Sequence, residues 1–302
     1  MIKLGECEKL NNTSVCIGNF DGVHMAHRAL IKMADDEKEN LKSVIYTFSP
    51  HPKKVFGMNI GFIQSEDEKK ETLMETECDY LFLKEATKEF LGKSPIEFVR
   101  EELVGRLGAK KVFVGYDFKF GKNSGGDAAL LSELGKEYGF SVHILPEMKI
   151  SDIPVKSSSI RHFIEAGDFY AANLLLGRLH SYEGEIVHGK RLGRNLGFPT
   201  ANIFPGKEKV LPPFGVYAAK AEVEGKTYNA VVNVGLNPTV EDGKNPKMEI
   251  NLMDFDKDIY GKRIKISFFR IIRREKKFGN IDELKYQIEK DVKNAKKCLT
   301  NC

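Results

Sequence analysis

The order of the predicted elements is the feature that most restricts the fold of this chain. Through about residue 176, short apolar runs typical of buried strands alternate with segments whose apolar residues recur at helical spacing. Because parallel strands need crossover connections, this alternation favours a doubly wound parallel sheet, an α/β fold whose ligands bind beyond the carboxyl ends of the strands. The predicted strands are Val15–Ile17, Ser43–Phe48, Tyr80–Leu83, Lys111–Val114 and Ser141–Ile144, and the predicted helices are His24–Lys38, Asp67–Glu77, Pro95–Leu107, Ala128–Tyr138, Ser158–Glu165 and Asp168–Leu176.

After Tyr182 the pattern changes to strands alone, followed by one final helix. The turn pairs Glu224-Gly225 and Asp242-Gly243 are typical of hairpins. The final helix has Asn280 as its cap and Glu283 as the capping-box partner. These features predict a small antiparallel β-barrel with a C-terminal helix. The predicted strands are Glu183–His188, Val216–Val223, Thr227–Val234, Met248–Met253 and Arg263–Ile272.

Length and composition fit two domains of an ordinary soluble protein. The chain has 302 residues, of which 41% are hydrophobic and 30% charged. No apolar run approaches the length of a membrane span, and the first residues lack the layout of a signal peptide. We therefore expect a cytoplasmic protein with no membrane partner, divided into domains 1–181 and 182–302. No C-x-x-C pair occurs, so we expect neither a zinc site nor a disulfide framework from the five cysteines, Cys7, Cys16, Cys78, Cys298 and Cys302.

The two halves differ in charge. Residues 1–182 hold 24 Lys and Arg against 27 Asp and Glu, whereas residues 183–302 hold 23 against 16. A basic excess suits nucleic acid, polyphosphate ligands or a solvated face without a partner. Because the basic residues form no dense arm, we predict small-molecule substrates and no nucleic-acid partner. The oligomeric state stays open.

Residues 14–27, SVCIGNFDGVHMAH, predict a buried strand, a tight glycine turn and a helix start. A helix start exposes backbone N–H groups and a positive dipole end, which suit a phosphate. His24 and His27 lie three apart and can donate hydrogen bonds to phosphate oxygens as charge develops. Two surface histidines at an ordinary helix start are the alternative, but the complete segment favours nucleotide chemistry. The turn residues assigned to ATP are Gly18, Phe20 and Asp21.

A second phosphate cradle is predicted at residues 155–161. Ser157 and Ser158 can cap the helix that begins there, and Arg161 projects near its start. An ordinary helix cap with a surface arginine is the alternative. The cradle gains support from the histidine turn, because a triphosphate needs its charge neutralised from two sides.

Two further loops follow predicted strands and should reach the same edge of the sheet. Residues 115–121 resemble a loop motif of flavin adenylyltransferases, and this resemblance implies that Asp117 accepts hydrogen bonds from a ribose or a flavin. Phe118 and Phe120 can pack against a ligand ring or belong to the core, and the sequence favours neither. His51, between two prolines, contacts a ligand or shapes the rim.

In the second half, residues 188–202 read HGKRLGRNLGFPTAN. Thr200 and Asn202 lie two apart, so on an extended segment they face the same side. A hydroxyl and an amide oxygen there can hold Mg²⁺, which prefers oxygen ligands. Three glycines allow backbone amides to turn toward phosphates, and they are Gly189, Gly193 and Gly197.

Glu249 lies in an alternating segment, residues 247–255, with Asn251 and Met253 on its own face. A carboxylate lining a cleft can take the proton of a primary alcohol, as a kinase base must. A surface glutamate is the alternative. Residues 274–278, before the last helix, are similar to a segment of riboflavin kinases, and this resemblance implies that Arg274 covers a flavin or nucleotide. A solvated charge run is the alternative.

In order along nearly the full chain, these motifs resemble the bacterial bifunctional riboflavin kinase/FAD synthetase family. Residues 18–27 resemble G-x-F-D-x-x-H-x-G-H, with Ala26 in place of the second glycine. Residues 114–121 resemble V-G-x-D-F-x-F-G, and residues 156–161 are similar to S-S-T-x-I-R, with Ser157, Ser158 and Arg161 at its Ser, Thr and Arg places. The string from Gly189 to Asn202 resembles the riboflavin kinase motif.

The resemblance implies two ATP-dependent steps, in which riboflavin becomes FMN and FMN becomes FAD with release of pyrophosphate. It implies that Glu249 is the kinase base and that Thr200 and Asn202 hold Mg²⁺. Asn251 departs from the histidine often found two residues after the base. Two rivals remain, namely that only one half is active, with Ala26 making the adenylyltransferase more suspect, or that the chain is a flavin-binding sensor that contacts RNA through its basic half.

Overall fold

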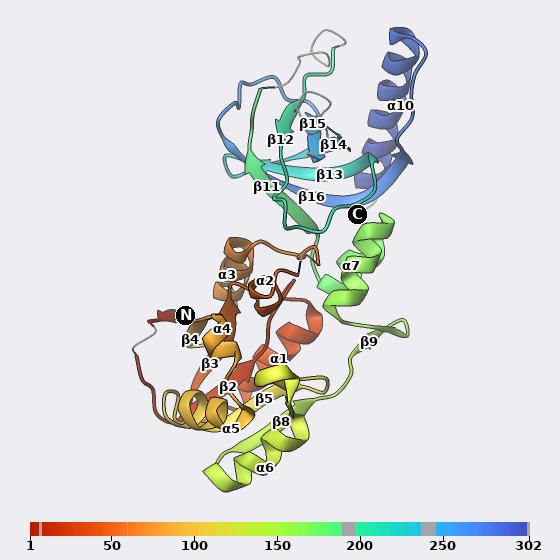
Figure 1. Ribbon diagram of the computed structural model, residues 1–302. Coiled ribbons are helices and arrows are strands. Elements are labelled where there is room, and N and C mark those ends of the chain that lie inside the picture. The colour runs from red at the N-terminus through yellow and green to blue at the C-terminus, as the bar shows by residue number, and fades with distance from the viewer. Residues whose placement is uncertain (6–7, 59, 189–196, 237–245, 301–302) are drawn as a thin grey trace. The chain divides into compact units, whose positions relative to one another are not determined.

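The computed structural model describes residues 1–5, 8–58, 60–188, 197–236 and 246–300. The chain divides into two compact units, Met1–Ser157 and Ser158–Cys302, and each is described here by itself. Figure 1 shows the first unit in red to yellow and most of the second in green to blue.

A six-stranded sheet forms the centre of the first unit, and all of its strand pairs are parallel. Helices pack on both faces of this sheet, so the predicted doubly wound α/β fold is confirmed. The strands, in their order across the sheet, are β1 (Ile2–Leu4), β4 (Tyr80–Glu85), β3 (Lys42–Ser49), β2 (Thr13–Ile17), β5 (Ala109–Gly115) and β8 (Ser141–Leu145).

Successive residues of the central strands serve two separate cores. Cys16, Ile45 and Phe113 face a core that includes residues of α1 (Met25–Asp36) and α3 (Glu66–Met74). Their neighbours on the same strands face the opposite core, which α6 (Ala128–Tyr138) helps to form. The strands therefore have few polar positions, as expected for a sheet buried on both faces.

Local signals in the first unit are largely confirmed. Asp127 caps α6 by accepting a hydrogen bond from Leu130 N at 3.0 Å, and Gly139 ends the helix with φ +81°. The helix expected over Pro95–Leu107 is instead α5 (Pro95–Phe98) followed by a π-helical segment, Val99–Val104. The remaining short elements are α2 (Pro52–Val55), α4 (Lys88–Leu91), β6 (Lys119–Phe120), a 3₁₀ turn (Lys122–Ser124), β7 (Gly126–Asp127), β9 (Lys149–Ile150) and β10 (Ile153–Pro154).

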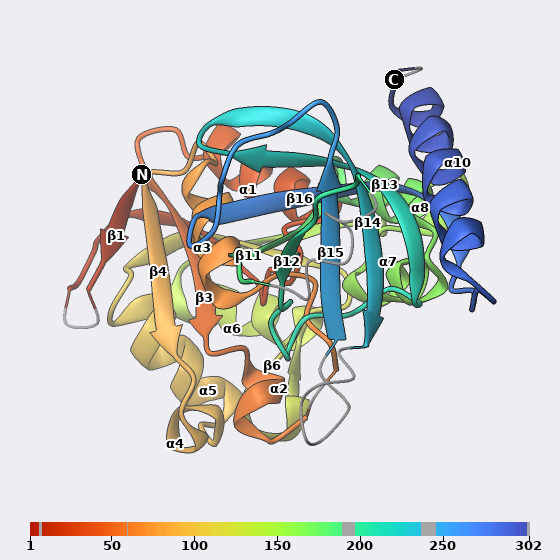
Figure 2. The same ribbon diagram turned by 90° about the horizontal axis from the view of Figure 1, so that it is seen from above.

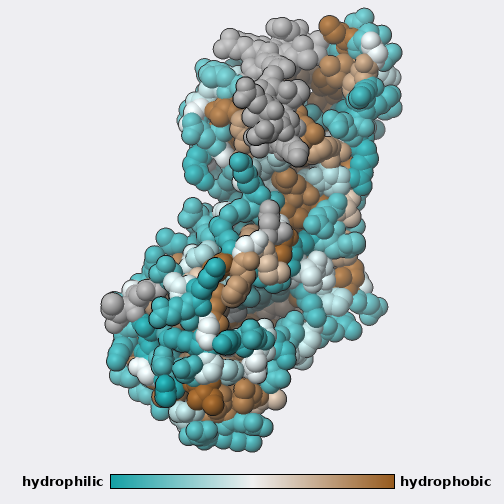
Figure 3. Space-filling view, viewed as in Figure 1, coloured by the Kyte–Doolittle hydropathy of each residue, from teal (hydrophilic) through white to brown (hydrophobic). Residues whose placement is uncertain are grey.

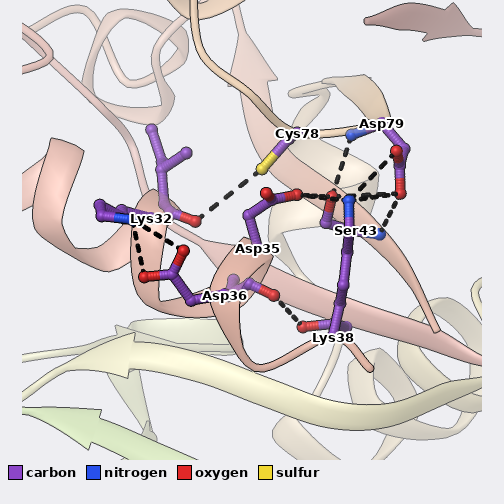
Figure 4. Close-up of polar contacts among 10 residues, drawn as sticks. Lys32, Asp35, Asp36, Lys38, Ser43, Cys78 and Asp79 are labelled. Carbon is purple, nitrogen blue, oxygen red and sulfur yellow. Dashed lines mark hydrogen bonds and ion pairs between the residues drawn. The ribbon is translucent and has the colours of Figure 1, made fainter. Parts of the chain in front are cut away.

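A polar network holds the amino-terminal ends of β3 and β4, the opposite edge from the predicted site (Figure 4). Ser43 Oγ donates to Asp35 Oδ1 at 2.6 Å, and Ser43 N donates to Asp79 Oδ2 at 2.9 Å. Burial raises the pKa of Asp79, but hydrogen bonds from Ser43 and the charge of Lys38 outweigh it, so the pKa lies below its ordinary value. This network joins the end of α1 to two strands.

The second unit is a curled antiparallel sheet with a long C-terminal helix, α10 (Ile281–Thr300), which confirms the predicted small barrel. The strands, in sheet order, are β11 (His180–Glu185), β16 (Arg263–Arg274), β13 (Gly215–Val223), β14 (Lys226–Leu236), β15 (Pro246–Leu252) and β12 (Ala201–Ile203). The two edge strands of this sheet, β11 and β12, approach each other. A Cβ on Gly184 of β11 would lie 3.1 Å from Ile203 Cβ on β12, and Val187, just after β11, forms a β-bridge with Asn202.

Two helices before the barrel pack with it. In α8 (Phe169–Leu176), Phe169 lies with its ring centroid 4.8 Å from that of Phe268, and Asn173 Nδ2 donates to Phe268 O at 2.9 Å. These contacts explain why α8 clusters with the second unit, and at the end of α7 (Ser157–Ala166) Arg274 Nη2 donates to Ala166 O. The sequence instead places the boundary between residues 181 and 182, after both helices.

The predicted hairpin at Glu224-Gly225 joins β13 and β14, and both turn residues have positive φ, 51° and 71°. The pair Asp242-Gly243 lies outside the described residues. Asn280 caps α10 as predicted, because its Oδ1 accepts a hydrogen bond from Glu283 N at 2.8 Å. The return hydrogen bond of the predicted capping box differs, because Glu283 Oε2 accepts from Gly279 N and not from Asn280 N.

The face of the molecule in Figure 3 is mostly hydrophilic, with apolar patches. None of the helices in the described ranges combines the length and apolar character needed to cross a membrane.

Candidate active sites

In the first unit, the two histidines lie together at the start of α1. His24 is the cap residue, and its Nδ1 accepts a hydrogen bond from His27 N at 3.3 Å. The rings stack with centroids 3.5 Å apart and planes 15° apart. Because Nδ1 of His24 accepts, its neutral ring carries the proton on Nε2. The structure therefore brings both imidazoles to a helix start, as the sequence predicts.

The turn between β2 and α1 is held from inside. Phe20 is fully buried with φ +52°, and Asp21 Oδ1 accepts from Ile63 N at 3.0 Å. Gly22 has φ +89°, and a Cβ there would lie 2.9 Å from Ile63 Cδ1, so glycine is required. Thus the side chains of Phe20 and Asp21 support the turn, and Gly18 N donates to Tyr46 O at 3.2 Å.

The start of α7 reaches this turn. Ser157 Oγ donates to Asp21 O at 2.9 Å, which places one residue of the predicted second cradle beside the first. Ser158 and Arg161 follow Ser157 in α7 but belong to the second unit, so their part in this site rests on the sequence.

The loop after β5 contains both structural and exposed side chains. Phe118 and Phe120 stack with centroids 5.5 Å apart, and Phe120 is buried 5.6 Å from Phe98. Phe120 is therefore a core residue, whereas Phe118 is half-buried. Asp117 is exposed, and its Oδ2 lies 3.8 Å from Lys156 Nζ, a cation that the sequence reasoning missed although it directly precedes Ser157.

His51 is buried in its own loop. It caps α2, where Nδ1 accepts from Lys53 N at 3.1 Å, and its ring lies 5.0 Å from that of Phe62. These contacts account for His51 as a residue that shapes the rim. The apolar side chains that follow it are exposed instead, with Phe56 60% and Met58 50% accessible. Only the folded structure reveals that exposure.

In the second unit, strand register assembles the site. Asn202 on β12 pairs with Glu249 on β15, which pairs in turn with Asn233 on β14. Directly paired residues of antiparallel strands place their side chains on one face, so the three form a polar row. Figure 2 shows β12, β15 and β14 side by side. Asn233 has no distinguishing sequence motif and was not predicted.

The oxygen of Asn202 is a strong indication of a ligand. Asn202 is 2% exposed, and among the described residues its Oδ1 has no hydrogen-bond partner. Leaving a buried polar atom unpartnered costs about 1–3 kcal/mol. Thr200, half-buried, lies two residues earlier. Two neutral oxygen donors of this kind fit a hard cation such as Mg²⁺.

The other residues singled out in the second half of the sequence are Asn251, Arg274 and three glycines. Asn251 Nδ2 donates to Pro199 O at 2.9 Å, which ties β15 to the segment that leads into Thr200. Arg274 Nη2 donates to Ala166 O at 3.1 Å. Gly197 is exposed with φ +87°, whereas Gly189 and Gly193 lie outside the described residues.

Comparison with known proteins covers both units. A family model for FAD synthetase matches residues 6–159, and one for riboflavin kinase matches residues 176–299. The bifunctional riboflavin kinase/FMN adenylyltransferase of Bacillus subtilis is 34% identical, with 97% of this chain and 95% of the relative covered. The Escherichia coli protein of the same name is 35% identical over 93% and 90% of the two chains.

A solved structure described as a macrolide-efflux protein from Streptococcus pneumoniae has the same fold along almost its whole length. Its TM-score is 0.86 at 28% identity, with 98% of this chain and 99% of that chain covered. This chain therefore belongs to the bifunctional riboflavin kinase/FMN adenylyltransferase family and is an enzyme that phosphorylates riboflavin to FMN and adenylylates FMN to FAD.

Proposed function

We propose that Glu249 is the general base of the kinase and that Asn202 and Thr200 hold its Mg²⁺. The observation that carries the proposal is the pairing of Asn202 with Glu249 across two strands, with the buried Asn202 oxygen in need of a partner. The riboflavin 5′-hydroxyl gives its proton to Glu249 as its oxygen attacks the γ-phosphorus of ATP, and the bond to ADP breaks. Bound Mg²⁺ supplies positive charge to the phosphate oxygens.

Other residues of the second domain bind and orient the substrates. The backbone amides at Gly189, Gly193 and Gly197 contact phosphate oxygens. Arg274 covers the flavin. Asn251 keeps the segment before Thr200 against β15 through its bond to Pro199, so that the oxygen donors stay beside the base.

For adenylyl transfer we propose that the FMN phosphate attacks the α-phosphorus of a second ATP and that pyrophosphate leaves. His24 and His27 donate hydrogen bonds that strengthen as negative charge develops at the helix start. Ser157, Ser158 and Arg161 bind phosphate oxygens from the other side, and the backbone of Gly18, Phe20 and Asp21 contacts ATP. Asp117 accepts a hydrogen bond from a hydroxyl or N–H group of the ribose or flavin. Phe118 packs beside the ligand ring, and Phe120 supports Phe118 from the core.

The functional domains proposed are 1–181 for FMN adenylylation and 182–302 for the kinase. This division gives α7 to adenylyl transfer although the helix packs with the second unit. This division is supported by Ser157, the first residue of α7, which donates a hydrogen bond to Asp21 O in the turn between β2 and α1. We also propose a cytoplasmic enzyme whose partners are small molecules, with no nucleic acid or membrane partner, and the lack of a dense basic arm supports this.

The experiment that tests these assignments follows both products chromatographically. Riboflavin, ATP and Mg²⁺ should yield FMN and then FAD, and FMN with ATP tests the first half alone. Omitting Mg²⁺ should stop FMN formation. FMN formation that persists after chelation of divalent cations would contradict the metal assignment, and a gel shift with RNA would contradict the proposed partners.

A further inference from the structure

Lys247 lies in β15 two residues before Glu249, so both side chains are on the same face of the strand. Lys247 Nζ donates to Glu249 Oε1 at 2.8 Å. The Lys247 side chain is 13% exposed, whereas that of Glu249 is 41% exposed. A lysine this buried is unusual, and holding its long side chain in one arrangement costs conformational entropy. The cation is therefore anchored more firmly than the carboxylate that it contacts.

The sheet makes room for this lysine. Lys247 pairs directly with Gly235 on β14, which has no side chain to compete for space on that face. A second carboxylate approaches the same position, because a Cβ on Gly235 would lie 3.7 Å from Glu275 Oε1. The lysine thus lies on the face that carries Asn202, Glu249 and Asn233, two residue pairs along the β14–β15 ladder from the Asn233–Glu249 pair.

We propose that Lys247 is a positioning residue for riboflavin phosphorylation, which holds Oε1 of Glu249 so that Oε2 faces the substrate hydroxyl. The inference rests on the proposed role of Glu249 as base. A general base acts only from hydrogen-bond reach, and a free carboxylate on a half-exposed side chain samples many rotations. One charge-assisted hydrogen bond at 2.8 Å removes that freedom. The hydroxyl proton then passes to Oε2 as the phosphoryl group transfers and ADP leaves.

The test measures kcat and KM of both reactions in Lys247→Met, which keeps the stem length and removes the charge. We expect kcat for FMN formation to fall about 10- to 100-fold, as for other losses of orientation near a reacting group, with KM for riboflavin and ATP nearly unchanged. Lys247→Arg should restore part of the rate. FMN adenylylation in the same protein should be unchanged, which shows that the first unit is folded.

A matched control is Lys265→Met, since Lys265 Nζ also pairs with a glutamate, at 3.3 Å from Glu183 Oε1, but on β16 and away from the polar row. It should leave kcat unchanged. If Lys247→Met destabilises the second unit, Lys247→Gln provides a smaller change, and thermal unfolding of each variant is followed beside its kinetics.

The double variant Lys247→Met/Glu249→Gln separates positioning from direct contact with phosphate. If Lys247 acts through Glu249, the double variant is no slower than Glu249→Gln. A further full drop in kcat, a large rise in KM for ATP, or wild-type kcat in Lys247→Met would overturn the inference. Wild-type kcat in Glu249→Gln would instead overturn the base assignment, and the inference with it.

Discussion

The two halves of this enzyme bring their site residues together in different ways. In the first unit, the turn after β2, the loop after β5 and Ser157 are distant in sequence and meet because parallel strands end at one edge of a sheet. In the second unit, Asn202, Glu249 and Asn233 meet because antiparallel register sets them opposite one another. One site depends on topology, and the other depends on register.

The difference decides which parts of the chain contact ligands. At the first site the side chains of Phe20 and Asp21 support the turn, and the groups proposed to bind phosphate are the two histidines at the start of α1. At the second site, the groups proposed to contact ligands are side chains on one face of the sheet. A one-residue slip of β15 would turn Glu249 to the opposite face, and such a slip would abolish that site.

The largest effect should come from Glu249→Ala. Loss of a positioned general base costs about 10²–10⁴-fold in rate, so FMN formation should nearly stop. Conversion of supplied FMN to FAD should continue, because that site lies in the other unit. Chromatography of both products measures this. Glu222→Ala, an exposed glutamate on β13, is the matched control. Loss of both reactions would show that the two sites are not independent.

His27→Ala tests the other side of the comparison. Removing one hydrogen-bond donor to a developing charge costs about 2.7–4 kcal/mol in comparable sites, or about 10²–10³-fold in rate. FAD formation should fall while FMN accumulates from riboflavin. Lys32→Ala, on an exposed face of the same helix, should change neither product. An equal loss of FMN and FAD would identify His27 as a residue needed for folding.

Asn202→Ala tests whether register creates a metal site. Affinity for Mg²⁺ should fall about 10- to 100-fold, because the buried oxygen donor is lost. Calorimetric titration of Mg²⁺ into the protein with ADP measures this without turnover, and the Mg²⁺ dependence of FMN formation measures it with turnover. Asn229→Ala, at an exposed position of β14, is the control. An unchanged affinity would remove Asn202 from the metal assignment.

The smallest effect concerns acid stability of the second unit. Burial, together with the charges of Lys209 and Arg178, holds the pKa of His180 well below its ordinary value of 6.5. The unfolded chain therefore binds a proton that the folded unit does not, and stability falls as the pH drops below about 6.5. One such group contributes a slope of up to about 1.4 kcal/mol per pH unit.

The check is urea unfolding of the protein between pH 7.5 and about pH 5. Wild-type stability should decrease with acidity more steeply than that of His180→Phe, which cannot titrate. Kinase activity should also be lost on acid incubation before adenylyltransferase activity. Parallel pH profiles for the two proteins would mean that His180 protonates without cost.

Much of the fold follows from local pattern. The alternation of apolar runs and helices predicts the parallel sheet, and cap residues such as Asp127 and Gly139 mark helix ends correctly, because hydrogen bonds within a few residues decide these features. The same holds for the Glu224-Gly225 hairpin, whose positive φ values suit that turn. His24 and His27 are also only three residues apart, so the local sequence predicts that they lie together at the start of α1.

Other features depend on contacts between distant segments. The edge strand β1 is only three residues long and exists through its pairing with β4. Strand β12 is likewise defined by β15, and α8 packs with the second unit through contacts such as that between Phe169 and Phe268. Short segments have no periodicity of their own to read.

For the sites, the sequence by itself determined which residue types are present and which strand ends carry them. Only the tertiary structure decided that Phe20 and Asp21 serve the turn, that Asn233 stands beside Glu249, and that Lys247 holds the Glu249 carboxylate. The physical reason is that register and burial arise when separate strands pair, and no single stretch of the chain contains that information.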